Sequence, residues 1–317
     1  MVEKFSVAKI KYKLEDHMLI GSIYDRVIMK FKYNTPKLAF LYNVIIGQKH
    51  RMLYYKMLRR SFLEECTRDR YWEEDEKVVN KDTIWFCWLQ GLDHAPELVK
   101  RCLESLQRKL PDKKIIIIDE ENFFDFIELP EYIIEKRREG IIGAAHFADI
   151  IRLELLIRHG GYWIDATVLC TDTKMLCYIE ELPIFMFSFY YFGFNPEIME
   201  VNNWMLYGTT NQNIFCLTRE FLYHYWKRYD RAKNYFFCQL FMTMALEYYE
   251  DEYKRMPIVS QVDAHILATY IFDDYDKEKY ELLKLQTGFH KLSTRFDRAF
   301  LQKEGTFYDR IIRRGEY

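Results

Sequence analysis

Three charged residues around a glycine turn have the types and spacing to bind a polyhydroxylated ligand. Asp149 and Arg152 are three positions apart in an apolar stretch, and Asp165 follows the aromatic run after Gly160 and Gly161. Residues three apart share one face of a helix. Two interpretations stay open. The pair is an intrahelical ion pair worth only ~0.2–0.5 kcal/mol, or it lines a polar cleft and holds the hydroxyls of a sugar or ribose.

The elements that position these residues follow from the local sequence. The apolar spacing over residues 145–157 predicts a helix that ends in basic residues, with Gly160 as its stop. Residues 162–164 predict a short strand. That strand places Asp165 at its carboxyl end, where open α/β sheets bind their ligands.

Upstream, a second pattern predicts the start of a parallel sheet. The apolar runs 83–88 and 114–119 predict buried strands, and residues 97–106 between them have helical spacing. This β-α-β order predicts a nucleotide site at the carboxyl edge of the sheet. The chain has no Gly-x-Gly-x-x-Gly and no Walker loop, which argues against a typical dinucleotide site or a P-loop.

The block from Ala145 to Thr167 resembles the bacterial capsular polysaccharide synthesis proteins. These are similar to glycosyltransferase family 32 and, more distantly, to the large clostridial glucosylating toxins. Their shared elements are a helix with Asp-x-x-Arg, a Gly-Gly turn and a strand ending in Asp-x-Asp, matched here by residues 149–152, 160–161 and 165–167. The resemblance covers roughly residues 80–295. It implies an α/β fold of the GT-A type, a Rossmann-like nucleotide-sugar transferase domain with a mixed, mostly parallel central sheet.

The resemblance also implies an activity and roles for single residues. The implied activity is a nucleotide-sugar-dependent hexosyltransferase that builds capsular polysaccharide or lipopolysaccharide, is assisted by Mn²⁺ or Mg²⁺ and retains the anomeric configuration. The implied catalytic residues are Asp149, Arg152 and Asp165. The implied donor-binding residues are Trp85, Trp88, Asp149, Arg152, Asn203, Trp204 and Lys291. The implied metal ligands are Asp165, Thr167 and His290. For the tryptophans and the histidine, a place in the core is the competing interpretation.

One departure from the pattern bears on the metal. Thr167 stands where the second acid of Asp-x-Asp is expected. Hard cations bind several oxygen ligands, so Asp165 alone is a poor site, although the Thr167 hydroxyl and Asp172 are further oxygen donors nearby. A catalytically degenerate protein that binds nucleotide sugars or polysaccharides therefore remains an alternative. A metal-dependent glycoside hydrolase is weaker, because no carboxylate pair with a recognisable partner occurs.

The N-terminal region differs from the rest in charge. Residues 26–60 contain nine lysines and arginines, and no acid lies between Asp25 and Glu64. We expect a basic helical extension over residues 1–78, followed by the transferase domain over residues 79–317. The basic face either is solvated or docks on an anionic membrane surface, where each basic residue adds ~1 kcal/mol.

Composition limits the partners and the compartment. A net charge of -2 over 317 residues argues against a nucleic-acid binder. Seven cysteines without a Cys-x-x-Cys favour buried thiols in a reducing cytoplasm, no signal-peptide pattern occurs, and the apolar runs are too short to cross a bilayer. We expect a cytoplasmic protein, peripheral on the inner face of a bacterial membrane. Its expected partners are a UDP- or GDP-sugar donor and a glycan or lipid-linked glycan acceptor.

Overall fold

The computed structural model describes residues 12–15, 21, 23–25, 27, 36–190, 195 and 197–317. The chain forms two compact units, residues 1–58 and 59–317. The first contains most of helix α3 (Pro36–Cys66). Within the segment 26–60 that is predicted to dock on a membrane, residues 26 and 28–35 lie outside the described residues.

The boundary between the units lies at residues 58/59, inside α3, whereas the sequence suggested 78/79. Residues 59–78 join the second unit because their aromatic side chains pack there. Phe62 stacks on Phe241 with ring centroids 5.5 Å apart, and the Trp72 indole N–H donates to the Tyr249 hydroxyl at 3.3 Å. Burying rings of this size stabilises the unit that contains them.

The second unit is built on a five-stranded sheet with strand order β2-β1-β3-β6-β5. The strands are β1 (Thr83–Cys87), β2 (Lys114–Ile118), β3 (Gly161–Ile164), β5 (Ile184–Ser188) and β6 (Val201–Gly208). Strand β1 pairs in parallel with β2 and β3, whereas β6 pairs antiparallel with β3 and β5. Within this sheet β6 therefore opposes four strands of common direction. The predicted α/β class with a mixed, mostly parallel sheet is confirmed.

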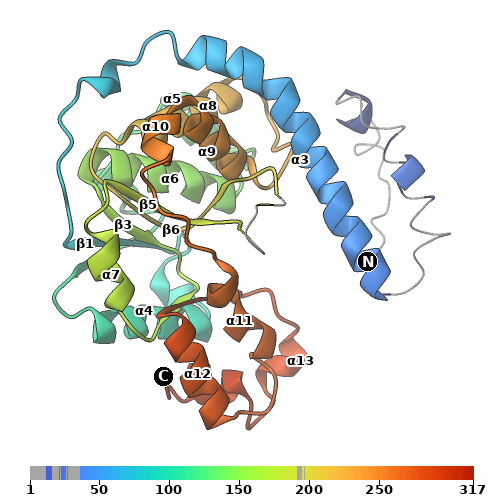
Figure 1. Ribbon diagram of the computed structural model, residues 1–317, viewed down its shortest axis with the longest axis vertical. Helices are drawn as coiled ribbons and strands as arrows, with labels where there is room; N and C mark the ends of the chain where they lie inside the picture. Colours follow the sequence, from blue (N-terminus) through green and yellow to red (C-terminus); the bar gives the residue numbers. More distant parts are fainter. Residues whose placement is uncertain are drawn as a thin grey trace. The chain divides into compact units, whose positions relative to one another are not determined.

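Helices cover both faces of this sheet (Figure 1). On one side lie α5 (Glu131–Arg138), α6 (Ala144–His159), α8 (Asn213–Arg228) and α9 (Phe237–Tyr248). On the other side lie α4 (Glu97–Lys109) and α7 (Lys174–Ile179). Successive side chains of β1 point to opposite faces of the sheet, so neighbouring residues pack against different helical layers. Phe86 belongs to the core that includes Val99 of α4, whereas the Trp85 ring lies 5.4 Å from the His159 ring at the end of α6.

A smaller sheet and the remaining helices complete the unit. Strands β4 (Val168–Cys170) and β7 (Phe289–Lys291) pair antiparallel. The other helices are α10 (Glu250–Tyr253), α11 (Val262–Tyr270), α12 (Lys277–Gln286) and α13 (Arg298–Leu301), with a π-helical turn η4 (Tyr308–Arg313). Short 3-10 turns are η1 (Tyr71–Glu73), η2 (Leu92–His94) and η3 (Phe123–Asp125). A second core joins this C-terminal region to the outer face of α4, with Cys102 packed among Leu267 and Ile311.

The predicted helix, glycine turn and strand around Asp165 are confirmed as α6, Gly160 and β3. Gly161 has φ 94°, and a Cβ there would lie 2.6 Å from the Thr83 carbonyl oxygen. Only glycine allows β3 to start this close to β1. The turn thus fixes the line along which β3 delivers Asp165.

All seven cysteines are free. Five are buried, as the sequence suggested, but Cys66 is half-buried and Cys177 is exposed. Over the part of the chain that the structure describes, no helix combines the length and apolarity needed to cross a bilayer.

We predict that Gly288→Ala destabilises the β4–β7 sheet. A Cβ at Gly288 would overlap the Asp172 carbonyl oxygen, so β7 must shift away from β4. Overpacking of this kind costs about 1–3 kcal/mol. Urea unfolding should show the loss, and Gly143→Ala is the matched control because nothing lies within 4 Å of its added Cβ. Equal stability of the two variants would contradict this account of the sheet.

Candidate functional site

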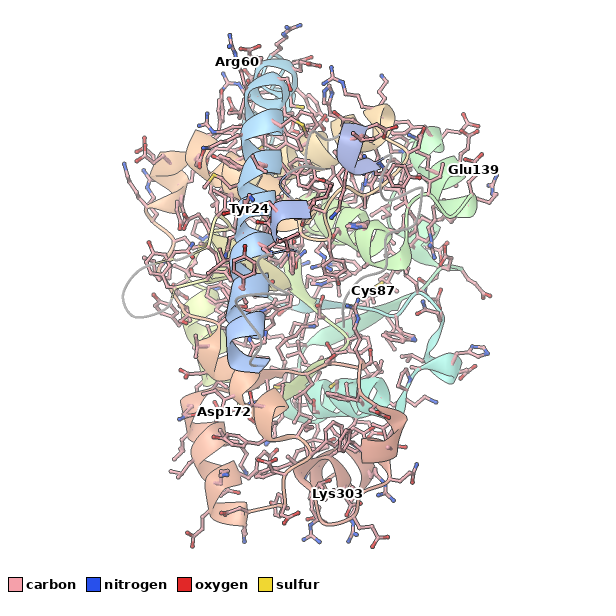
Figure 2. All side chains as sticks on the ribbon, turned by 90° about the vertical axis from the view of Figure 1, so that its right-hand side faces the viewer. Tyr24, Arg60, Cys87, Glu139, Asp172 and Lys303 are labelled. Carbon is pink, nitrogen blue, oxygen red and sulfur yellow. The ribbon has the colours of Figure 1, made fainter. Side chains whose placement is uncertain are left out.

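A cleft of about 390 Å³ opens where β1 and β3 end. Cys87, the last residue of β1 and labelled in Figure 2, lines it together with Asp165, which follows β3. Its other walls come from the start of α6, from β6 and α9, and from the segment that leaves β7. The cleft is therefore at the carboxyl edge of the parallel strands, where ligands bind in open α/β sheets.

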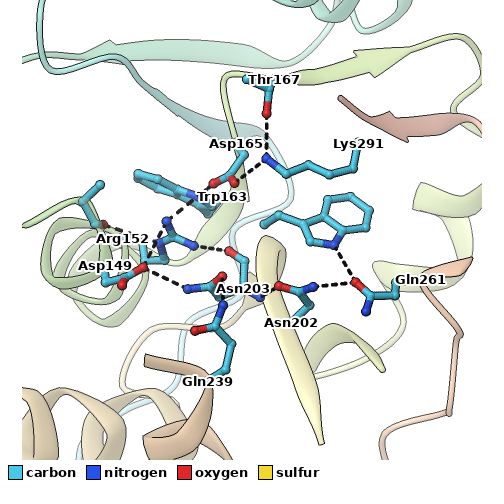
Figure 3. A network of polar contacts seen from close by, with 12 residues as sticks. Asp149, Arg152, Trp163, Asp165, Thr167, Asn202, Asn203, Gln239, Gln261 and Lys291 are labelled. Carbon is cyan, nitrogen blue, oxygen red and sulfur yellow. Dashed lines mark hydrogen bonds and ion pairs between the residues drawn. The ribbon is translucent and has the colours of Figure 1, made fainter. Parts of the chain in front are cut away.

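A row of alternating charges crosses this cleft (Figure 3). Arg152 Nη2 lies 3.2 Å from Asp149 Oδ1 and 3.5 Å from Asp165 Oδ1. On the far side, Lys291 Nζ donates to Asp165 Oδ2 at 2.8 Å and to Thr167 Oγ1 at 2.6 Å. The Asp149–Arg152 pair is thus not only an ion pair within the helix, because it continues through Asp165 to Lys291.

Several protein groups hold Arg152 in place. Its guanidinium lies over the Trp163 ring at 4.7 Å, and it donates to the Asn203 carbonyl oxygen. The Trp163 indole N–H in turn donates to Asp165 Oδ1 at 2.8 Å. Arg152 is only 7% exposed in its side chain, so its charge acts mainly on the two carboxylates.

The charges of Arg152 and Lys291 determine the protonation state of Asp165, which lies between them. Burial opposes ionisation of Asp165, but Lys291 and Arg152 outweigh it and lower the pKa of the carboxyl below its usual value. Burial likewise opposes the charge on Arg152, while Asp149 and Asp165 raise its pKa. Both groups are therefore ionised at neutral pH.

An amide relay extends the row of charges into α9. Asn203 donates through Nδ2 to Asp149 Oδ1 at 2.9 Å, and Gln239 donates through Nε2 to Asn203 Oδ1 at 2.9 Å. A carboxylate only accepts hydrogen bonds, so each amide must turn its NH₂ towards Asp149. The relay therefore uses Gln239 Nε2 and leaves the buried Gln239 Oε1 without a hydrogen bond from the described residues.

Two buried polar atoms of the lining have no partner among the described residues. They are Trp88 Nε1, a donor, and Gln239 Oε1, an acceptor. Leaving such a group unpaired costs about 1–3 kcal/mol, so buried polar atoms normally meet protein, water or ligand. Lining residues that carry an unused donor and an unused acceptor beside ordered charges suit a polar, hydroxyl-bearing ligand.

The structure brings most of the predicted site residues together. The cleft is lined by Trp88, Asp149, Arg152, Asp165, Thr167, Asn203 and Lys291. Three others lie elsewhere, namely Trp85, Trp204 and His290.

The two tryptophans outside the cleft are core residues. The Trp85 indole N–H donates to the Gly160 carbonyl at 2.9 Å. Trp204 stacks on Phe187 at 4.4 Å and donates to Gln261 at 3.4 Å. Neighbouring strand residues point to opposite faces, so Trp204 cannot join Asn203 at the cleft.

His290 is separated from Asp165 for the same reason. It lies next to Lys291 on β7 and faces the other way, fully buried, with Nε2 3.0 Å from Thr171 Oγ1. Burial lowers the pKa of His290 to about 4. The predicted ligand set of Asp165, Thr167 and His290 is therefore not assembled.

The remaining donor set does not fit a divalent cation. Both Asp165 oxygens and the Thr167 hydroxyl already accept hydrogen bonds from nitrogen donors. No cluster of three or more His, Cys, Asp or Glu side chains arranged for a metal occurs among the described residues. Mn²⁺ and Mg²⁺ require several oxygen ligands, so the predicted metal stays a prediction without a matching site.

Sequence reasoning did not find Gln239, Trp163 or Arg295 as parts of the site. Gln239 lies in an apolar helix, Trp163 in an apolar strand and Arg295 in a polar segment after β7. The one available signal was Gln239, a polar residue on the buried stripe of α9 and only 6% exposed. A buried polar residue among apolar neighbours needs a partner.

Comparison with known proteins places the chain in a family. The sequence model of the capsular polysaccharide synthesis proteins matches residues 35–311. The chain belongs to this family. The match extends from the start of α3 to η4 and includes all the residues of the charged row.

Two curated proteins are similar in sequence to parts of this capsular polysaccharide synthesis protein. An O-glycosyltransferase, PaGT, of Phomopsis amygdali is 26% identical over 46% of this chain and 39% of its own length. The O-glycosyltransferase braB of Annulohypoxylon truncatum is 29% identical over 30% of this chain and 25% of its own. The chain thus spans well under half of the length of these curated relatives. Among solved structures, the PaToxG glycosyltransferase gives a TM-score of 0.42 at 14% identity, covering 84% of this chain and 95% of that one.

We predict that Arg152→Met lowers stability by about 3–5 kcal/mol, because it leaves the buried carboxylate of Asp149 without its cation and removes one of the two cations beside the half-buried Asp165. Urea unfolding measures the loss. The matched control is Arg60→Met, whose i,i+4 pair with Glu64 is 90% exposed on the arginine side and should contribute less than about 0.5 kcal/mol. A loss below 1 kcal/mol for Arg152→Met would show that the row of charges is not structural.

We also predict that Asp165 makes stability depend on pH. Because the folded-state pKa is lowered, the ionised carboxylate stabilises the fold above its unfolded pKa of about 3.9. That contribution is lost as pH falls through this value towards the folded pKa. The stability difference between wild type and Asp165→Asn should therefore be larger at pH 7 than at pH 3. A difference of the same size at both values would refute the prediction, and the exposed Asp112→Asn is the control.

Proposed function

We propose that this protein is a glycosyltransferase that moves a sugar from a nucleotide-sugar donor to a hydroxyl group of a surface glycan. Membership of the capsular polysaccharide synthesis family supports the acceptor class. The names of the fungal relatives support the reaction type. The cleft at the carboxyl edge of the sheet supports a donor site there, because open α/β sheets bind their ligands at this edge.

The observation that carries this proposal is the pair of unpartnered polar atoms in the cleft wall, Trp88 Nε1 and Gln239 Oε1. A sugar ring presents hydroxyl groups that both donate and accept, which suits a lining that contains both kinds of polar side chain. The adjoining carboxylate of Asp149 adds an acceptor. Its Oδ1 lies against Arg152 and Asn203, whereas its Oδ2 lies 3.8 Å from His146 Nδ1.

The charged residues of the cleft have two roles, because some bind the donor and one positions other residues. Arg152 acts as a positioning residue, because its N–H groups are used by protein acceptors and fix the two carboxylates. Lys291 and Arg295 are the cations of the lining that face the anionic part of a donor. Sugar transfer leaves a nucleoside diphosphate, and fixed cations near the developing charge lower the barrier.

Finer features of the reaction are proposals from the family resemblance. They are a UDP- or GDP-linked donor, retention of the anomeric configuration, a family 32-like descent and an acceptor carried on a lipid. We also propose that residues 26–60 dock on an anionic membrane surface. Electrostatic attraction of the basic segment to anionic lipids is its physical basis.

The first experiment is hydrolysis of a panel of UDP- and GDP-sugars without acceptor. Slow release of the nucleoside diphosphate from one donor supports the transferase and names its base. Binding of a donor without any turnover, with or without a glycan acceptor, would favour the alternative of a degenerate sugar-nucleotide-binding protein.

We predict that Trp88→Phe weakens use of that donor and costs less stability than a matched substitution in the core, because Trp88 is only partly buried. The substitution removes an indole N–H that has no protein partner but lines the cleft. Loss of one neutral hydrogen bond, worth ~0.5–1.5 kcal/mol, corresponds to a rise in KM of about 2- to 10-fold. Steady-state kinetics and urea unfolding measure the two effects.

The matched control is Trp85→Phe, which removes an indole N–H bonded to the Gly160 carbonyl in the core. This variant should lose stability and keep the KM of the donor. Reversal of the pattern, with Trp85→Phe raising KM and Trp88→Phe only destabilising the fold, would contradict the assignment of the cleft.

A further inference from the structure

The ammonium group of Lys291 sits between Asp165 and Thr167, the two positions at which a sugar transferase of this resemblance is expected to hold a metal (Figure 3). Its Nζ is 2.8 Å from Asp165 Oδ2 and 2.6 Å from Thr167 Oγ1. A single positive charge thus bridges one carboxylate and one hydroxyl at the carboxyl edge of the sheet.

The backbone holds Lys291 in this place. In the β4–β7 ladder Val168 is paired with Lys291, and the Leu292 N–H donates to the Thr167 carbonyl at 2.8 Å. Thr167, the residue before β4, therefore lies next to the register pair of Val168 and Lys291. The register thus holds the backbone of Lys291 beside the segment that follows Asp165, within reach of its ammonium group.

The charges and ligands around Asp165 oppose a divalent cation. Oδ1 accepts from Trp163 and lies near Arg152, and Oδ2 accepts from Lys291. A Mn²⁺ or Mg²⁺ ion on Oδ2 would meet the ammonium at close range and find one carboxylate instead of several oxygen ligands. The carboxylate of Asp165 is already neutralised by Lys291.

Lys291 still has capacity for a ligand. An ammonium has three N–H donors, and the contacts with Asp165 and Thr167 use two of them. The side chain is 20% exposed and lines the cleft. Arg295 lines the same wall and adds a further positive charge. Across the lining, three cations (Arg152, Lys291 and Arg295) face two carboxylates (Asp149 and Asp165), which leaves an excess of positive charge for an anion.

We propose that Lys291 replaces the divalent metal in this cleft, so that the diphosphate of the donor is bound by the fixed ammonium and by Arg295 without Mn²⁺ or Mg²⁺. This inference rests on the proposed function. Thr167 is then a neutral partner that suits the single charge of the ammonium. A second acid at this position would suit a divalent cation.

The test measures binding of UDP and GDP to the full chain by titration calorimetry, in EDTA and in MnCl₂. The expected result is a Kd for one nucleotide that changes less than about 2-fold between the two buffers. Lys291→Ala should weaken this binding at least about 10-fold in EDTA, which is the loss of one charge-assisted contact. Lys174→Ala is the control, because Lys174 is 86% exposed and lies outside the cleft.

The outcomes separate this inference from the proposed function. Binding that is lost in EDTA and restored by Mn²⁺ overturns the inference and leaves the transferase proposal standing. Binding in EDTA that is unaffected by Lys291→Ala overturns the role of Lys291. No binding of either nucleotide or of any nucleotide sugar in either buffer overturns both proposals. The comparison of buffers is made on wild-type protein, so it holds even where a variant fails to fold.

Discussion

The structure of the cleft depends on how the charge of Asp165 is balanced. Its carboxylate lies between a buried guanidinium from α6 and an ammonium from β7, and the Trp163 indole fixes its orientation. Buried charges persist only when paired, so these groups must be in place together. These contacts tie together the elements that carry the groups, which are α6, β3 and β7. Asp149, Asn203 and Gln239 then extend the same row by hydrogen bonds.

The order of elements could be predicted from the sequence because it is written in local patterns. The helix before Gly160, the strand before Asp165 and the first β-α-β unit each have their own periodicity and stop signals, and all three are present. The residues at the centre of the site, Asp149, Arg152 and Asp165, follow from those elements.

The direction of single side chains could not be predicted in the same way. His290 and Lys291 were both expected at the site, as were Asn203 and Trp204, but neighbours on a strand face opposite sides. Which member of each pair reaches the cleft depends on the pairing of β7 with β4 and of β6 with β3. That register is a long-range property. Gln239 was missed because its partner, Asn203, comes from a distant segment.

The β4–β7 ladder also determines when the site exists during synthesis. Asp165 and its ammonium partner are 126 positions apart in the chain. The ribosome makes α6 and β3 long before β7. Until β7 is made, the carboxylate of Asp165 lacks Lys291, its second cation. Closing so large a loop costs entropy that is recovered only when the ladder forms. The cleft is therefore among the last parts of the protein to be completed, and a nascent chain that stops before β7 lacks the ammonium that balances Asp165.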